Sequence, residues 1–184
     1  MTRVLVPLAA GCEEMEAVTI IDVLRRGGIE VVTASQDAHP VRASRGVVLV
    51  ADAVLGDVIS SDRFDMVVIP GGMGGTEALL ADDDFLDFLR HMSRSGRLIG
   101  AICAAPMILG RVGVLDGLRF TAYPGVIDDG MIPAAVNTGN AVESDNLIMT
   151  SRGPGTALDF ALAVLERLAG RDVRITVEKQ LVRD

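Results

Sequence analysis

One segment of the sequence joins a buried strand, a cysteine and the start of a helix. The apolar residues Leu98–Ile102 predict a short strand, and Pro106 fits a first helical turn, where the N–H that proline lacks would have no partner. Cys103 therefore falls on the sharp turn between them, the position of a nucleophile elbow. A helix N-terminus favours the reactive thiolate. The alternative is that Cys103 is a small buried hydrophobe, as most free cysteines are.

A glycine-rich segment suits such a nucleophile. Pro70–Gly75 follows the apolar run Met66–Ile69 and lacks the spacing of a dinucleotide or phosphate-binding loop. Because glycine lets the backbone approach a reacting carbonyl, the N–H groups of Gly72 and Ala104 would form an oxyanion hole. The alternative is a plain turn.

Three carboxylates follow the first apolar run of the chain. Of Glu13, Glu14 and Glu16, one would serve as the acid–base partner of the thiol. The alternative is a solvated first helical turn, where carboxylates suit the helix dipole.

The elements that must position these residues alternate between strands and helices. This pattern predicts an α/β fold with a flavodoxin-like, doubly wound, mostly parallel sheet and helices on both faces. The carboxyl ends of its strands would bring Cys12–Glu16, Gly71–Gly75 and Cys103–Ala105 to one crevice. The expected strands are Arg3–Leu8, Ile29–Ala34, Met66–Ile69, Leu98–Ile102 and Leu147–Thr150, with a hairpin arm at Gly46–Val50; the expected helices are Met15–Arg26, Asp84–Ser95 and Pro154–Leu168.

Composition limits the class of protein. The 184 residues suit a single domain, residues 1–184, and 49% hydrophobic with 23% charged residues indicates a globular chain. A net charge of −8 argues against nucleic acid and anionic membrane surfaces as partners. Two cysteines are too few for a disulfide scaffold, and no apolar run is long enough to cross a membrane, so we expect a cytoplasmic protein.

Other cysteine and lysine chemistries lack their residues. Both histidines, His39 and His91, precede Cys103, whereas a glutamine amidotransferase takes its base histidine from the C-terminal part of the chain. The only lysine, Lys179, lies in the tail, which disfavours Schiff-base catalysis. The spacing of histidines and cysteines fits no zinc site, and we expect no metal and no cofactor.

Taken together, the motifs resemble the ThiJ/PfpI superfamily, and within it the subgroup of the Parkinson-disease protein deglycase and the bacterial chaperone YajL. The resemblance covers nearly the whole chain in order. The segments that carry it are Gly11–Glu16, Asp22–Gly28, Ser44–Arg45, Val68–Gly72, Ala101–Pro106 and Thr150–Thr156.

The resemblance implies roles for particular residues. Cys103 would be the nucleophile, and Glu16 the carboxyl group that shares a proton with it. Gly72 and Ala104 would supply the oxyanion N–H groups. The family is typically dimeric, and Arg45 matches a residue near the partner's site.

One departure from the family concerns Tyr123. Some members have a histidine beside the cysteine where this chain has tyrosine, whose pKa of about 10 makes it a poor general base at neutral pH. Peptidase chemistry is therefore not expected, and Glu16 remains the proton shuttle. We assign Gly71, Tyr123 and Arg45 to substrate binding.

The implied activity is that of a glutathione-independent glyoxalase acting on a small dicarbonyl such as methylglyoxal, or the related removal of glyoxal adducts from amines and thiols. A second hypothesis uses the same cysteine with little turnover, in a redox sensor of oxidative stress or a chaperone. A homodimer is also expected, because Met15–Leu24 carries more apolar residues than one stripe facing a sheet needs.

Overall fold

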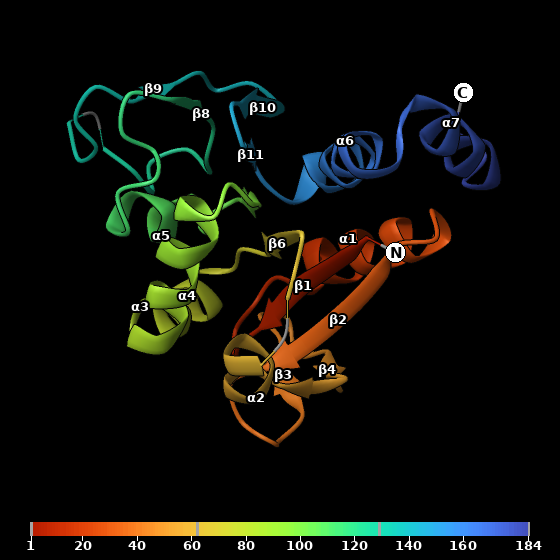
Figure 1. Ribbon diagram of the computed structural model, residues 1–184, viewed down its shortest axis with the longest axis horizontal. Helices are drawn as coiled ribbons and strands as arrows, with labels where there is room; N and C mark the ends of the chain where they lie inside the picture. Colours follow the sequence, from red (N-terminus) through yellow and green to blue (C-terminus); the bar gives the residue numbers. More distant parts are fainter. Residues whose placement is uncertain (1, 62, 129, 184) are drawn as a thin grey trace.

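The computed structural model describes residues 2–61, 63–128 and 130–183, and in these ranges a seven-stranded sheet runs through the molecule (Figure 1). The strand order is β10-β11-β7-β6-β1-β2-β5. β10 pairs antiparallel with β11 at one edge, and the other neighbouring pairs of this sheet run parallel. The strands are β1 (Arg3–Leu8), β2 (Glu30–Ser35), β5 (Ala53–Val54), β6 (Met66–Ile69), β7 (Leu98–Ile102), β10 (Val142–Asp145) and β11 (Ile148–Ser151).

Helices cover both faces of the sheet. In Figure 1, α3, α4 and α5 lie to the left of β1 and β2, whereas α6 lies above them and α7 above and to the right. One face carries α1 (Glu14–Arg26), α6 (Ala157–Ala169) and α7 (Arg171–Gln180); the other carries α2 (Leu55–Ser61), α3 (Met73–Leu80), α4 (Asp83–Arg94) and α5 (Pro106–Arg111). The predicted fold class is therefore confirmed.

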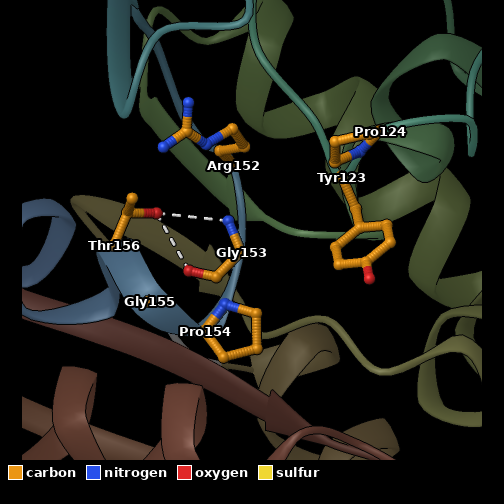
Figure 2. A pocket seen from close by; sticks show the side chains of 7 residues that line it. All are labelled: Tyr123, Pro124, Arg152, Gly153, Pro154, Gly155 and Thr156. Carbon is orange, nitrogen blue, oxygen red and sulfur yellow. Dashed lines mark hydrogen bonds between the residues drawn. The ribbon is translucent and has the colours of Figure 1, made fainter.

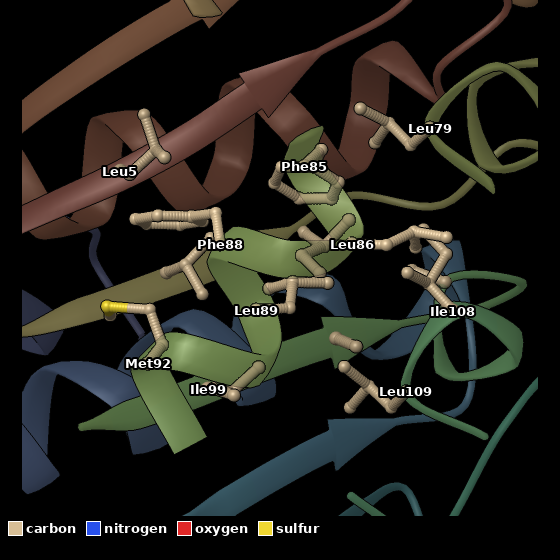
Figure 3. Packing of buried hydrophobic residues seen from close by; sticks show 14 of the residues in the cluster. Leu5, Leu79, Phe85, Leu86, Phe88, Leu89, Met92, Ile99, Ile108 and Leu109 are labelled. Atoms are coloured by element: carbon tan, nitrogen blue, oxygen red, sulfur yellow. The ribbon is translucent and has the colours of Figure 1, made fainter. Parts of the chain in front are cut away.

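The two faces bury separate hydrophobic clusters because side chains alternate along each strand. On β1, Leu5 packs into the cluster under α3, α4 and α5, whereas Val4 and Val6 pack against α1 and α6. Figure 3 shows part of the first cluster, to which Phe85 and Leu89 of α4 and Ile99 of β7 belong. This packing fixes the carboxyl ends of β1, β6 and β7 side by side at one edge of the sheet.

Several expected elements have the bounds that the sequence predicts. β1, β6 and β7 agree residue for residue, and α5 begins at Pro106. The expected hairpin arm is also present, since β4 (Val48–Leu49) pairs antiparallel with β3 (Val41–Arg42). The predicted helix Pro154–Leu168 is wrong at its start: residues Pro154–Thr156 form a 3-10 turn, and α6 begins at Ala157.

Other elements were not predicted. α3 contains Gly74 and Gly75, poor helix formers that made the segment look like a turn. The short α2, the C-terminal α7, the edge strand β10 and the small parallel pair β8 (Arg119–Phe120) and β9 (Val136–Asn137) also lacked a clear periodic signal. None of the helices in the described ranges has the length and apolar character needed to span a lipid bilayer.

Candidate active site

Cys103 lies on the turn between β7 and α5 in a strained conformation. Its φ is 64°, in the left-handed region that residues other than glycine seldom adopt. Two backbone hydrogen bonds hold it there: its N–H donates to Ser151 O at 2.9 Å, and its carbonyl accepts from Tyr123 N at 2.8 Å. The expected geometry of a nucleophile elbow is present.

Glu16 meets Cys103 from the first turns of α1. Its side chain is fully buried, and its Oε2 accepts a 2.7 Å hydrogen bond from Gly71 N. Among the described residues, Oε1 has no hydrogen-bond partner. Buried polar atoms without a partner are rare in folded proteins, which marks this oxygen as a candidate for proton chemistry.

Gly71 lies close to both side chains. A Cβ built on Gly71 would lie 2.6 Å from Cys103 Cβ and 2.9 Å from Glu16 Oε2. Any larger residue would push the carboxyl away from the cysteine. Gly71 was assigned to substrate binding, but in this geometry it fits between the two groups expected to do the chemistry.

Gly72 brings a backbone N–H to the sulfur. Its φ is 85°, and a Cβ there would lie 2.4 Å from Gly11 O, so only glycine fits between the two backbone segments. The N–H groups of Gly72 and Ala104 both interact with the Cys103 sulfur and lower the pKa of the thiol. The two expected oxyanion donors therefore converge on one point.

Burial and mutual repulsion disfavour ionisation of both Glu16 and Cys103. Burial raises the pKa of Glu16 to about 7, against the opposing hydrogen bonds from Gly71 and Cys103. Opposite an ionised Glu16, the pKa of Cys103 rises to about 12, first because the thiol is buried and then because of the Glu16 charge. The expectation that the helix N-terminus favours the thiolate is thus corrected: burial and the facing Glu16 charge outweigh the N–H groups of Gly72 and Ala104, and the pKa of the Cys103 thiol lies above its ordinary value.

A cavity of about 560 Å³ opens above the sulfur. Of the remaining predicted residues, Arg45 and Tyr123 both line it, and both side chains are exposed. Arg45 is fixed through its backbone N–H, which donates to Glu14 Oε1 at 2.9 Å. Among the three glutamates left open by the sequence, Glu16 is the one that contacts Cys103, while Glu14 supports the loop of Arg45.

Sequence reasoning gave no individual role to several residues of the cavity wall, although Ser44 and Pro154 lie in segments that carry the resemblance. Ser44 Oγ lies 2.9 Å from Glu13 Oε2 and 2.9 Å from Glu14 Oε2, which ties the β3–β4 hairpin to the start of α1. Met73, Val126 and Pro154 complete the wall from three other segments. These residues lie outside the strands and apart in sequence, so no periodic signal could have joined them.

Metal ligation finds no support in the part of the chain that the structure describes, where no group of three or more His, Cys, Asp or Glu side chains could hold an ion. The second cysteine, Cys12, is free and buried, and burial followed by the charge of Glu14 raises the pKa of its thiol to about 11.

Comparison with known proteins shows which family and which solved structure the chain is similar to. Residues 2–167 match the DJ-1/PfpI family. The chain is 44% identical to protein dj-1beta of Drosophila melanogaster, over 97% of this chain and 95% of that protein. It is 38% identical to the glutathione-independent glyoxalase DJR-1.2 of Caenorhabditis elegans, over 92% and 89%. The solved structure of oxidized DJ-1 from Toxoplasma gondii superposes with a TM-score of 0.93 at 40% identity, over 100% and 99%.

Replacing Glu16 by glutamine should stabilise the protein at alkaline pH. A folded-state pKa of about 7, above the ordinary value of 4.5, means that Glu16 costs stability increasingly as the pH rises from about 4.5 through 7. We expect Glu16→Gln to raise the free energy of unfolding by about 3 kcal/mol at pH 8 and by less than about 1 kcal/mol at pH 5. Urea denaturation at the two pH values measures this difference.

The exposed Glu77 of α3 provides a matched control, since Glu77→Gln should show no such difference between the two pH values. A gain from Glu16→Gln that is equal at pH 5 and pH 8 would show that Glu16 is not a carboxyl with a raised pKa.

Proposed function

The chain belongs to the DJ-1/PfpI family, and we propose that it acts on methylglyoxal or glyoxal as a cysteine-dependent glyoxalase that needs no glutathione. The observation that carries the proposal is the contact of a buried carboxyl with an elbow cysteine across a single glycine, Gly71. A relative named as a glutathione-independent glyoxalase supports the same reaction class.

The first step joins the substrate to Cys103. The sulfur adds to the aldehyde carbon while the thiol proton passes to the Glu16 carboxylate, whose pKa of about 7 suits a general base at neutral pH. The aldehyde oxygen becomes an alkoxide near the N–H groups of Gly72 and Ala104, which stabilise it as an oxyanion hole. Return of the proton from Glu16 to this oxygen gives a hemithioacetal.

The second step moves a hydrogen between neighbouring carbons. Glu16 removes the proton from the sulfur-bearing carbon to give an enediol and delivers it to the former ketone carbon, which yields a thioester of the 2-hydroxy acid. Water then cleaves the thioester, releasing lactate from methylglyoxal and restoring the thiol. The aldehyde carbon is oxidised and the ketone carbon reduced within one molecule, so the balance needs no external oxidant or reductant.

Two related roles use the same cysteine. Removal of dicarbonyl adducts from amines and thiols would follow from the same chemistry. However, an enzyme that only consumes free methylglyoxal also causes hemithioacetals to dissociate, by mass action. A redox sensor or chaperone would use Cys103 with little turnover. Product analysis with methylglyoxal alone separates catalysis from these alternatives. The free thiols of Cys12 and Cys103 suit a reducing compartment, and we propose the cytoplasm.

Cys103→Ser should abolish conversion of methylglyoxal to lactate without added glutathione, because a hydroxyl is a far weaker nucleophile than a thiol beside the same base. Cys12→Ser provides the control for loss of a buried thiol and should retain activity. Lactate formation by the purified proteins is the measurement. Undetectable lactate from folded wild type, or an active Cys103→Ser, would contradict the proposal.

The pH dependence should follow Glu16. The general base is the carboxylate, so kcat/KM should rise with pH through about 7 and then level off. Glu16→Gln should lower the rate by about 10²- to 10⁴-fold and remove this rise. A wild-type profile that is flat between pH 6 and pH 8, or an unchanged rise in the variant, would rule Glu16 out as the base.

A homodimer is proposed from the outer face of α1. Met15 and Val18 are 58% and 48% exposed, one helical turn apart, and the nearby β3–β4 hairpin exposes Val48. Light scattering should give twice the 19.4 kDa of the chain, and Val18→Asp should reduce that mass. Val136→Asp, an equal change at an exposed valine of β9, should not. Wild type at the mass of one chain at micromolar concentration would refute the dimer.

A further inference from the structure

A second cavity of about 320 Å³ adjoins the one above Cys103. It is lined by Tyr123, Pro124 and residues 152–156, and Figure 2 shows Tyr123 on one side and the segment 152–156 on the other. Tyr123 and Pro154 line both cavities. The two cavities therefore meet at these two residues.

The wall formed by residues 152–156 is held by buried hydrogen bonds. Thr156 Oγ1 accepts from Gly153 N at 3.2 Å and lies 2.7 Å from Ser151 Oγ (Figure 2 shows the contacts with Gly153). Ser151 in turn accepts the N–H of Cys103. The cavity wall and the elbow are thus parts of one hydrogen-bonded unit.

Tyr123 closes the opposite side. A Cβ built on Gly153 would lie 3.3 Å from Tyr123 Cδ2, so the ring packs directly against this glycine. The Tyr123 N–H is bound to the carbonyl of Cys103, while the side chain stays 49% exposed. An aromatic ring is therefore presented to the groove at a fixed place beside the nucleophile.

Arg152 lines this cavity, and its guanidinium lies at the rim on the side away from Tyr123 (Figure 2). Its Nη1 donates to the carbonyl of Gly139 at 3.0 Å, and among the described residues no carboxylate lies within ion-pair distance of its guanidinium. One neutral acceptor fixes the group and leaves other donors for a ligand. The net charge of the chain is −8, but the Arg152 guanidinium makes the potential locally positive and so favours an anion beside the proposed reaction site.

The size of the combined groove exceeds what methylglyoxal needs. Cavities of about 560 and 320 Å³ fall within the range that holds ligands of ordinary metabolite size. A substrate with only a methyl substituent would leave Arg152 and the second cavity unused. The geometry suits a 2-oxoaldehyde whose substituent passes between Tyr123 and Pro154 and ends in a carboxylate.

We propose that the second cavity is a substituent subsite in which Arg152 binds the terminal carboxylate of a 2-oxoaldehyde attached at Cys103. This inference rests on the proposed function and names its substrate class. The reaction is the one already described: each 2-oxoaldehyde takes up one water and becomes a 2-hydroxy acid, so a carboxylated substrate leaves as a 2-hydroxy dicarboxylate.

The test compares carboxylated and neutral substrates of equal length. The pairs are 4,5-dioxopentanoate with 2-oxopentanal, and 6,7-dioxoheptanoate with 2-oxoheptanal, which span two lengths of linker. In at least one pair, wild type should prefer the carboxylate, and Arg152→Gln should lower kcat/KM for that carboxylate by about tenfold or more, through KM. The same variant should leave kcat/KM for methylglyoxal and the neutral aldehydes within about twofold of wild type.

Two further variants sharpen the result. Arg167→Gln removes the same charge from an exposed position on α6 and should leave every substrate unchanged. Arg45→Gln tests the other cavity, since loss of the carboxylate preference there and not in Arg152→Gln would overturn the assignment. Equal losses on charged and neutral substrates, or no preference in either pair, would also overturn it.

Binding without turnover separates this proposal from the proposed function. Calorimetry on Cys103→Ser should show 2-hydroxyheptanedioate or 2-hydroxypentanedioate binding more tightly than the monocarboxylate of equal length, with the difference lost on adding Arg152→Gln. If methylglyoxal is not converted, the glyoxalase proposal fails while calorimetry still decides the subsite. If methylglyoxal is converted but calorimetry shows no difference, the subsite alone is wrong.

Discussion

The burial of Glu16 against Cys103 is the interaction on which the site depends. Both groups are buried and the pKa of each is raised, because removing a charge from water costs several kcal/mol. Gly71 sets their separation, and its N–H binds one oxygen of the carboxyl. The proton that the pair retains is what makes it suited to chemistry with carbonyl groups, in which protons must be moved between neighbouring atoms.

The fold holds Glu16 beside Cys103 although burying the two groups costs free energy. Glu16 is carried by α1, Gly71 and Gly72 follow β6, and Cys103 follows β7, so three separate chain segments must meet at one edge of the sheet. Parallel pairing of β1, β6 and β7 provides that edge, and the clusters on both faces prevent the strands from separating. Cys103 keeps its left-handed backbone conformation because its N–H and carbonyl are hydrogen-bonded to Ser151 and Tyr123.

Much of this could be predicted from the sequence, for identifiable reasons. Short apolar runs predicted the bounds of β1, β6 and β7, and Pro106 predicted the start of α5. The elbow followed from these two signals together, and family resemblance selected Glu16. By contrast, α3 begins within glycines because Gly74 and Gly75 must approach Gly11 and Cys12, a tertiary requirement that overrides helix propensity. The pKa of Cys103 could not be predicted either, because it depends on the carboxyl of Glu16, 87 positions earlier in the chain. No local sequence pattern encodes the distance between these two groups.

The most direct measurement is the pH titration of both groups in one sample, by carbon-13 NMR of the Glu16 carboxyl and the Cys103 Cβ in Cys12→Ser protein. A shared proton predicts that both resonances move together, with common midpoints, the first of them near pH 7. If the two resonances instead titrate in single, separate steps, so that the thiol ionises without any change at Glu16, the groups do not share a proton.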